Sequence, residues 1–308
     1  DGHKIAGSRI TMTASDPHGP MLRGDSVHNS GRNAASCQSC HGDKPHKQGL
    51  LQVELLNNHT NKLACQSCHV PAFARGGVAT KMAWDWSTAG RLTPEGKPIQ
   101  KKDAHGHVIY DSRKGDFKLG ENVVPEYLWF NGRVTYTTQE DKILGGSVVK
   151  INTFHGSPDD PAARIWPVKR FQGKQPYDLV HGHLLVPHTA TPDDSAFWFN
   201  FDWPKALQAG AEATGKPYSG RHDFVQTEML WPITHMVAPK EQALRCSQCH
   251  TGAAQSRLGS LAGVYLPARD AHPWIDRIGW LAVLAALAGV AVHALARIVT
   301  ARRSPAAH

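Results

Sequence analysis

The sequence predicts a fold of mainly short helices and loops with little β-structure, followed by one transmembrane helix near the C-terminus. Three features support this prediction. The chain contains 28 glycines and 20 prolines among 308 residues, and both residue types favour turns over long regular elements. Its six cysteines all fall in three copies of one short motif. Finally, residues 278–296 form an apolar stretch without Asp, Glu, Lys or Arg.

Composition places the chain among globular proteins, because 41% hydrophobic and 19% charged residues exclude a disordered or fibrous chain. The formal net charge is +8, but the basic residues are scattered rather than gathered in runs. This scatter argues against nucleic acid as a partner. The chain also contains 19 histidines, and a histidine-rich composition points to metal binding.

Each pair of cysteines belongs to a C-x-x-C-H motif, at residues 37–41, 65–69 and 246–250. This motif is the attachment signature of c-type haem. The two thiols add to the two vinyl groups of one porphyrin, and the following histidine then binds the iron. We therefore expect three covalent haems c, with the helices and loops of a multihaem cytochrome c packed around them. The expected attachment residues are Cys37, Cys40, Cys65, Cys68, Cys246 and Cys249, and the expected proximal ligands are His41, His69 and His250.

Two alternatives explain the cysteines less well. A zinc ribbon would use the four thiolates of the first two motifs, but it leaves Cys246, Cys249 and the three motif histidines unexplained. Three disulfides or redox-active dithiols would need a thioredoxin-like context of strand and helix. The sequence around the three motifs does not show that context.

Each haem iron also takes a sixth ligand, and a histidine precedes each motif at a short distance. His28 lies nine residues before Cys37, His59 lies six before Cys65, and His235 lies eleven before Cys246. These three are the first candidates for distal ligands, with Met236 as an alternative to His235. A predicted helix over 241–249 would separate His235 from Cys246, so we expect His235 to bind a neighbouring haem. The next candidates are His181, His183 and His188, followed by His18, His46 and His155.

The segment 70–245 contains no haem motif and is rich in turns and aromatic residues. Short strands are predicted at 107–110, 133–138 and 147–151, where β-branched and aromatic residues gather. A helix is predicted over 204–214, with a proline in its first turn and Gly215 after its end. A second helix is predicted over 238–250, with the third haem motif at its end.

The expected topology is a single-pass protein of the inner membrane. A helix over 278–296 would span about 28 Å, close to the thickness of a bilayer core. Arg297, Arg302 and Arg303 follow the span, and the positive-inside rule places them in the cytoplasm. We therefore predict a periplasmic multihaem domain over 1–274, a transmembrane helix over 275–299 and a cytoplasmic tail over 300–308. A buried core helix is the alternative.

Haem attachment outside the cytoplasmic membrane independently agrees with a periplasmic domain. The chain opens at Asp1 without a visible signal peptide. We therefore expect that a leader was removed or that a longer chain precedes this residue.

Several stretches resemble the octahaem tetrathionate reductase family of periplasmic cytochromes c. They are LACQSCHVP at 63–71, KMAWDWS at 81–87, VPEYLWFNG at 124–132 and WPITHMVAPK at 231–240. The resemblance covers roughly residues 15–255 and implies mostly bis-histidine haems, with His41, His69 and His250 proximal and His235 distal. It also implies a link to the reduction of tetrathionate, nitrogen oxyanions or hydroxylamine. The chain has three attachment motifs rather than eight, and no residue matches the lysine that ligates the family's catalytic haem.

Two functions are therefore expected from the sequence. The first is a membrane-anchored electron carrier between a quinol-linked membrane partner and a periplasmic acceptor. Its partner would be another cytochrome or a quinol-oxidising membrane subunit. The alternative is part or all of a haem-based reductase of tetrathionate or of small nitrogen or sulfur oxyanions. No catalytic residue is assigned.

Overall fold

The computed structural model describes residues 37, 41, 44–47, 50–234 and 236–303. The chain divides into two compact units. The first consists of Asp1–Arg245 with Leu261–Gly263, and the second of Cys246–Ser260 with Val264–His308.

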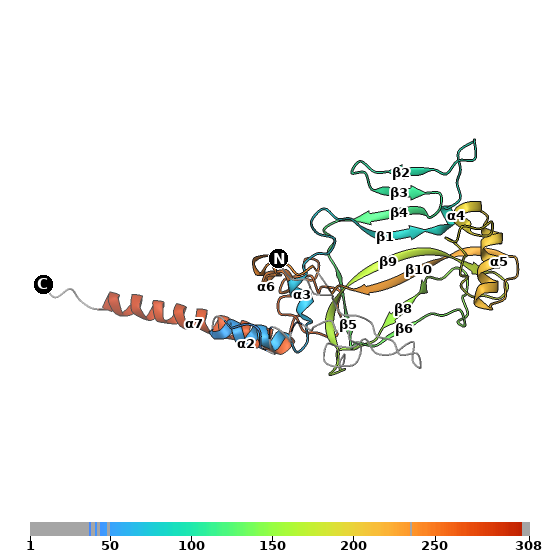
Figure 1. The fold of residues 1–308 in the computed structure, drawn as a ribbon. Coiled ribbons are helices and arrows are strands. Elements are labelled where there is room, and N and C mark those ends of the chain that lie inside the picture. The colour runs from blue at the N-terminus through green and yellow to red at the C-terminus, as the bar shows by residue number, and fades with distance from the viewer. Residues whose placement is uncertain (1–36, 38–40, 42–43, 48–49, 235, 304–308) are drawn as a thin grey trace. The chain divides into compact units, whose positions relative to one another are not determined.

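The first unit is built on an eight-stranded mixed sheet (Figure 1) with the order β2-β3-β4-β1-β9-β10-β7, in which β5 also pairs with β9. Its strands are β1 Thr80–Asp85, β2 Gln100–Lys102, β3 Val108–Asp111, β4 Gly115–Gly120, β5 Glu126–Phe130, β7 Val149–Lys150, β9 Arg164–Asp178 and β10 His222–Pro232. The β1–β9 and β7–β10 pairs are parallel, and the other pairs are antiparallel. A separate two-stranded sheet pairs β6 Val134–Tyr136 with β8 Asn152–Phe154.

The two longest strands, β9 and β10, lie next to each other in the sheet. They pair antiparallel from His222 opposite Asp178 to Pro232 opposite Val168. Ile165 and Val168 of β9 are almost fully buried and belong to the core. At about 3.3 Å per residue, the 15 residues of β9 span roughly 46 Å. The two ends of this strand therefore position features that lie far apart.

The prediction of little β-structure is wrong, as the eight-stranded sheet shows. The sequence of β9 contains Pro167, Gly173 and Pro176, and proline lacks the amide N–H that a sheet ladder uses. The carbonyl groups of both prolines nevertheless accept hydrogen bonds. Ile233 N–H donates to Pro167 O and Leu185 N–H donates to Pro176 O, both at 3.0 Å. Pairing with segments that are distant in sequence therefore stabilises β9, although its local sequence does not predict a strand.

The helices and 3-10 turns of the first unit are short. They are α2 Leu50–His59, α3 Cys65–His69, η1 Trp86–Thr88, α4 Phe197–Asn200, α5 Trp203–Thr214 and η2 Lys240–Gln242. The predicted helix over 204–214 is confirmed by α5, which begins at an Asp202 cap and ends at Gly215 with a φ of 66°. The strands predicted at 107–110, 133–138 and 147–151 correspond to β3, β6 and β7.

The predicted helix over 238–250 is wrong. In its place, η2 and the single turn α6 Cys246–Cys249 are separated by an extended segment. Ala243, directly after η2, has a ψ of 155°, which ends helical geometry. The proposed separation of His235 from Cys246 by one continuous helix therefore has no structural basis.

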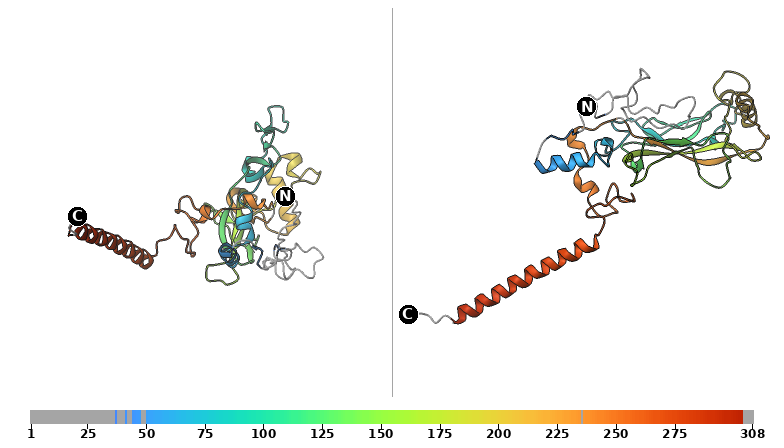
Figure 2. Two further views of the ribbon diagram at one scale, coloured as in Figure 1. Left: turned by 90° about the vertical axis from the view of Figure 1, so that its left-hand side faces the viewer. Right: turned by 90° about the horizontal axis from the view of Figure 1, so that it is seen from below.

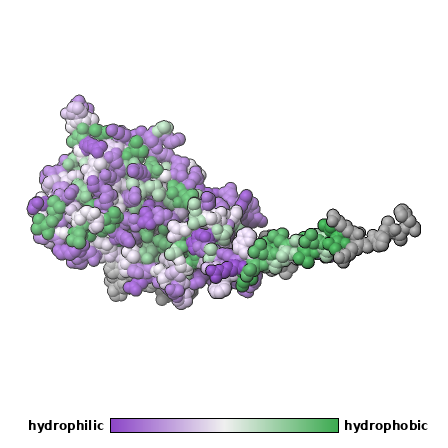
Figure 3. Space-filling view, turned by 180° about the vertical axis from the view of Figure 1, so that it is seen from behind, coloured by the Kyte–Doolittle hydropathy of each residue, from purple (hydrophilic) through white to green (hydrophobic). Residues whose placement is uncertain are grey.

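The second unit contains α6, a loop segment and the long helix α7 Pro273–Arg303. In the loop, the Arg269 guanidinium donates to Leu258 O at 2.9 Å and pairs with Asp270 at 2.7 Å. In Figure 2, α7 is one continuous helix, and Figure 3 shows its described surface as predominantly hydrophobic. Within the described residues, the stretch Pro273–Thr300 of α7 is the one helix long and apolar enough to cross a membrane, judged by length and composition.

Candidate haem-binding site

Two of the three C-x-x-C-H motifs meet at one cavity of the first unit. The cavity has a volume of about 770 Å³ and is lined by residues from the segments 37–69 and 237–245. From the motifs it receives Cys37, His41, Cys65, Cys68 and His69. Two further histidines, His46 and His59, also line it. The structure therefore gathers four imidazoles and three thiols around one space.

The second motif is held in place by hydrogen bonds on two sides. The buried Ser67 hydroxyl of α3 donates to Ile165 O at 2.6 Å, and the Ala64 N–H donates to the same carbonyl at 3.0 Å. From the segment after β10, Ala238 N–H donates to His69 O at 2.8 Å, and Leu244 N–H donates to Cys68 O at 2.9 Å. The start of β9 and the segment 238–244 thus fix the motif at the cavity wall.

The thiols and imidazoles at this cavity influence one another. A hydrogen bond with the Cys37 side chain lowers the pKa of the Cys65 thiol to about 6, despite the opposing effect of burial. Burial, with smaller contributions from His46 and His41, lowers the pKa of His69. A lowered pKa favours the neutral imidazole, which is the form that binds a metal. The contact between Cys37 and Cys65 also shows that the first and second motifs approach each other directly.

His46 is oriented by Asn57, a residue of α2 that is only 7% exposed. The Asn57 amide accepts from the His46 backbone N–H at 3.2 Å and donates to the His46 carbonyl at 3.0 Å. The Asn57 Oδ1 atom also lies 3.1 Å from His46 Nδ1. Three contacts therefore hold this histidine to the helix.

The residues around the cavity fit a covalently bound haem c. The second motif presents its two thiols and its imidazole at the same wall, as the attachment chemistry requires. Apolar side chains such as Leu56, Leu63 and Val237 complete the lining. The cavity volume lies in the range of about 300–1,000 Å³ that is typical of cofactor sites. Among the residues that the structure describes, no group of three or more His, Cys, Asp or Glu side chains forms a metal-ion site without a cofactor.

The third motif belongs to the second unit. Its cysteines, Cys246 and Cys249, begin and end α6, and His250 N–H donates to Cys246 O at 2.8 Å. The Ser256 hydroxyl donates to Cys249 O at 2.7 Å, so the following loop folds back on the motif. Burial raises the pKa of the Cys249 thiol.

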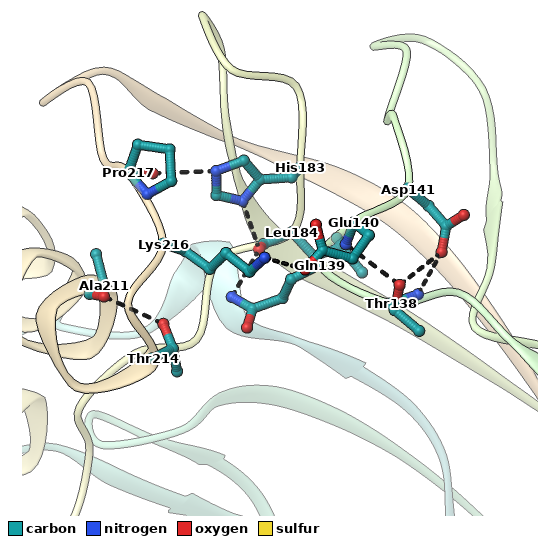
Figure 4. A network of polar contacts seen from close by, with 10 residues as sticks. All are labelled: Thr138, Gln139, Glu140, Asp141, His183, Leu184, Ala211, Thr214, Lys216 and Pro217. Atoms are coloured by element: carbon teal, nitrogen blue, oxygen red, sulfur yellow. Dashed lines mark hydrogen bonds and ion pairs between the residues drawn. The ribbon is translucent and has the colours of Figure 1, made fainter. Parts of the chain in front are cut away.

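Only some of the predicted distal ligands that the structure describes lie at the cavity. His59 lies at the cavity, whereas His28 and His235 lie outside the described residues, as does Cys40 of the first motif. His183 is hydrogen-bonded to Asp178 at the far end of β9, about 40 Å along the strand from Ile165. Figure 4 shows its ring between the carbonyl groups of Leu184 and Pro217, at 3.1 and 3.0 Å.

His181 and His188 lie in the same region as His183. The ring of His181 is 6.1 Å from that of His183, and His188 Nε2 is 2.8 Å from a carboxylate oxygen of Asp193. The structure therefore does not bring these histidines to the cavity. Sequence reasoning ranked His46 low and did not consider Asn57, because no spacing relative to a motif marks either residue.

Comparisons with known proteins identify the family of the chain. The family model "Cytochrome c bacterial" matches residues 81–253. The chain is similar to a solved structure, the octaheme cytochrome c from Shewanella oneidensis, with 39% identity and a TM-score of 0.63. The match covers 71% of this chain and 49% of that one, so the chain spans about half the length of the octahaem protein. No curated protein matches the sequence. The chain belongs to the bacterial cytochrome c family, whose cofactor is covalent haem c, and it is similar to about half of an octahaem multihaem cytochrome.

Proposed function

We propose that the protein is a membrane-anchored periplasmic electron carrier with three haems c. The haems would be attached through Cys37 and Cys40, Cys65 and Cys68, and Cys246 and Cys249, with His41, His69 and His250 as proximal ligands. The observation that carries this proposal is the shared cavity, where two motifs meet together with His46 and His59. Haems attached there would be close enough for electrons to pass between them.

The surplus of imidazoles at the cavity favours electron transfer over substrate binding. When bound, haem c supplies reversible one-electron chemistry at its iron. The imidazoles of His41 and His69 would each hold an iron from one side, and His46 and His59 lie at the same cavity as candidates for the other side. An iron with two imidazole ligands has no open position for a substrate.

The helix α7 supports the proposed membrane anchor. Its apolar side chains, among them Leu281, Leu287 and Val292, are more than 60% exposed within the chain. A helix that is apolar on all sides needs a lipid or protein surface around it. We propose that a bilayer provides it, with the haem domain in the periplasm and the C-terminal tail in the cytoplasm. The electron donor would then be a quinol-oxidising membrane subunit or another cytochrome.

A haem-based reductase is the second candidate, and two cationic residues favour it. Lys240 and Arg245 both line the cavity beside the two motifs. Such cations could hold tetrathionate or a small nitrogen or sulfur oxyanion next to an iron with an exchangeable ligand.

The haem assignment is tested on the full chain purified in detergent. The pyridine haemochrome assay and the intact mass should give three haems per chain. Cys65→Ser combined with Cys68→Ser should remove one haem and leave two. The matched pair Cys246→Ser and Cys249→Ser should do the same at the third motif. Retention of all three haems by either double variant would contradict the assignment.

Ligand binding then separates the two functions. A carrier with two protein ligands on every iron should show no rapid spectral change with cyanide or nitrite. A rapid change in one haem, together with turnover of tetrathionate or nitrite by the reduced protein, would favour the reductase. To test the topology, protease is added to intact spheroplasts and should digest the haem domain. Survival of the haem domain would place it on the cytoplasmic side and contradict the proposal.

A further inference from the structure

We infer that His46 is the sixth ligand of the iron that His69 binds, and that Asn57 is the positioning residue that presents His46 to this iron. The inference rests on the proposed attachment of a haem to Cys65 and Cys68. It goes further by selecting one histidine from the many in the sequence. It also gives a role to a buried asparagine that the attachment motif does not contain.

The first argument is the geometry of the two rings. The ring centres of His46 and His69 are 6.3 Å apart, and their planes differ by only 13°. An imidazole nitrogen binds a transition metal at about 2.0–2.1 Å, and ring bonds of about 1.33 Å place each nitrogen roughly 1.1 Å from its ring centre. A metal in line between two such rings would therefore keep their centres roughly 6.2–6.4 Å apart. The observed distance lies in this range.

The second argument is the tautomer that the neutral His46 ring adopts. The backbone N–H of His46 can only donate and its carbonyl can only accept, so their bonds to Asn57 fix which end of the amide is oxygen. The atom that faces His46 Nδ1 at 3.1 Å is therefore the acceptor Oδ1. Nδ1 must then carry the hydrogen, which leaves the lone pair on Nε2. Metal-binding histidines commonly use this arrangement, in which the other ring nitrogen donates to a fixed acceptor.

The third argument is that Asn57 is itself held firmly. Its side chain is 7% exposed, and its backbone carbonyl accepts from the Thr60 N–H at 3.2 Å and the Thr60 hydroxyl at 2.6 Å. It thus ties the segment containing His46 to the end of α2, and both His46 and His69 face the same cavity. A histidine held by two backbone contacts and one ring contact loses little further freedom when it binds a metal.

The test compares three variants of the haem-loaded full chain. His46→Ala should keep every covalent haem but convert one ferric iron from low spin to high spin in electron paramagnetic resonance. That haem should now bind cyanide rapidly, and added imidazole should restore its low-spin signal. His59→Ala removes the other additional histidine of the cavity, and His105→Ala removes a histidine of the β2–β3 hairpin. His105→Ala is the control and should leave every low-spin signal unchanged, whereas His59→Ala should retain the low-spin signal that His46→Ala loses.

Asn57 is tested by two further variants. Asn57→Asp keeps the acceptor that faces Nδ1, loses the donor to the His46 carbonyl and adds a negative charge. The added charge next to the Nδ1–H group should favour ferric iron. If the charge favours the ferric over the ferrous form tenfold, the midpoint potential of one haem falls by about 59 mV. Asn57→Leu removes the acceptor and the donor but keeps the number and branching of the side-chain heavy atoms. It should broaden or shift the low-spin signal of the same haem and leave the others unaltered.

The haem count distinguishes a failure of the proposed function from a failure of the inference about His46. Loss of no haem from the Cys65→Ser and Cys68→Ser double variant would overturn the proposed function. Normal haem content with an unchanged set of low-spin signals in His46→Ala would overturn this inference alone. A high-spin haem in His59→Ala, but not in His46→Ala, would likewise overturn it and assign the sixth ligand to His59. If His46→Ala fails to accumulate, unchanged spectra and potentials in both Asn57 variants would overturn the inference.

Discussion

Ser67 ties the second haem motif to the sheet, and Ser67→Ala should lower the stability of the first unit. Ser67 is 2% exposed, and its hydroxyl donates to Ile165 O at 2.6 Å, across 98 residues of sequence. The carbonyl of Ile165 would keep its bond from the Ala64 N–H at 3.0 Å, so it would not be left unsatisfied. The loss should therefore amount to one net hydrogen bond, about 1 kcal/mol.

The third motif supplies a matched control, because Ser247 is also a central residue of a C-x-x-C-H motif but is exposed. For a domain of 150–250 residues, 1 kcal/mol corresponds to a decrease of about 2–4 °C in the unfolding midpoint. Thermal unfolding of the haem-loaded protein, followed by far-ultraviolet circular dichroism, measures the change. Ser67→Ala should show this decrease and Ser247→Ala should show none. Equal midpoints for the two variants would refute the reasoning that α3 is anchored to β9 through this hydroxyl.

Three further predictions concern stability, acid sensitivity and the anchor. Helix propensity alone predicts that Gly210→Ala in α5 stabilises the protein. We expect it instead to destabilise by about 1–3 kcal/mol in calorimetry, because the new Cβ would collide with Val186 O. Burial raises the pKa of Asp178, but hydrogen bonds from His181, Ser219 and Val180 outweigh it and lower the pKa to about 2. This carboxylate should therefore stabilise the fold above pH 4 and lose its contribution as the pH falls toward 2. In Asp178→Asn, the midpoint temperature of unfolding should depend less on pH over that interval. A chain ending before Pro273 should fractionate as a soluble haem protein, and its retention in membranes would contradict the role of α7.

The sequence predicted local features well and long-range pairing poorly. The helix α5 could be predicted because its signals, Asp202 before it and Gly215 after it, are adjacent to the helix itself. The strand β9 could not, because Pro167 and Pro176 disrupt its pattern while its partners are distant segments such as β1 and β10. The same limit applies to the site. Each motif is evident from five residues, but the meeting of Cys37 with Cys65 depends on how the chain folds between and around them.

The histidines show why a count of candidate ligands could not identify the ones that line the cavity. His183 has an imidazole like that of His46, and it ranked higher from sequence because it belongs to a local cluster. Both of its ring nitrogens, however, face carbonyl oxygens, which only accept hydrogen bonds. Binding a metal there would cost one of these bonds in a site that is 6% exposed.

At His46 the contacts have the opposite consequence. The acceptor Asn57 Oδ1 engages one ring nitrogen, and the other is the nitrogen suited to a metal. On the proposed assignment, a haem ligand therefore differs from a structural histidine in the identity of the atoms opposite its two ring nitrogens. Those atoms come from Asn57 in one case and from the backbone of Leu184 and Pro217 in the other, and only the fold brings them into place.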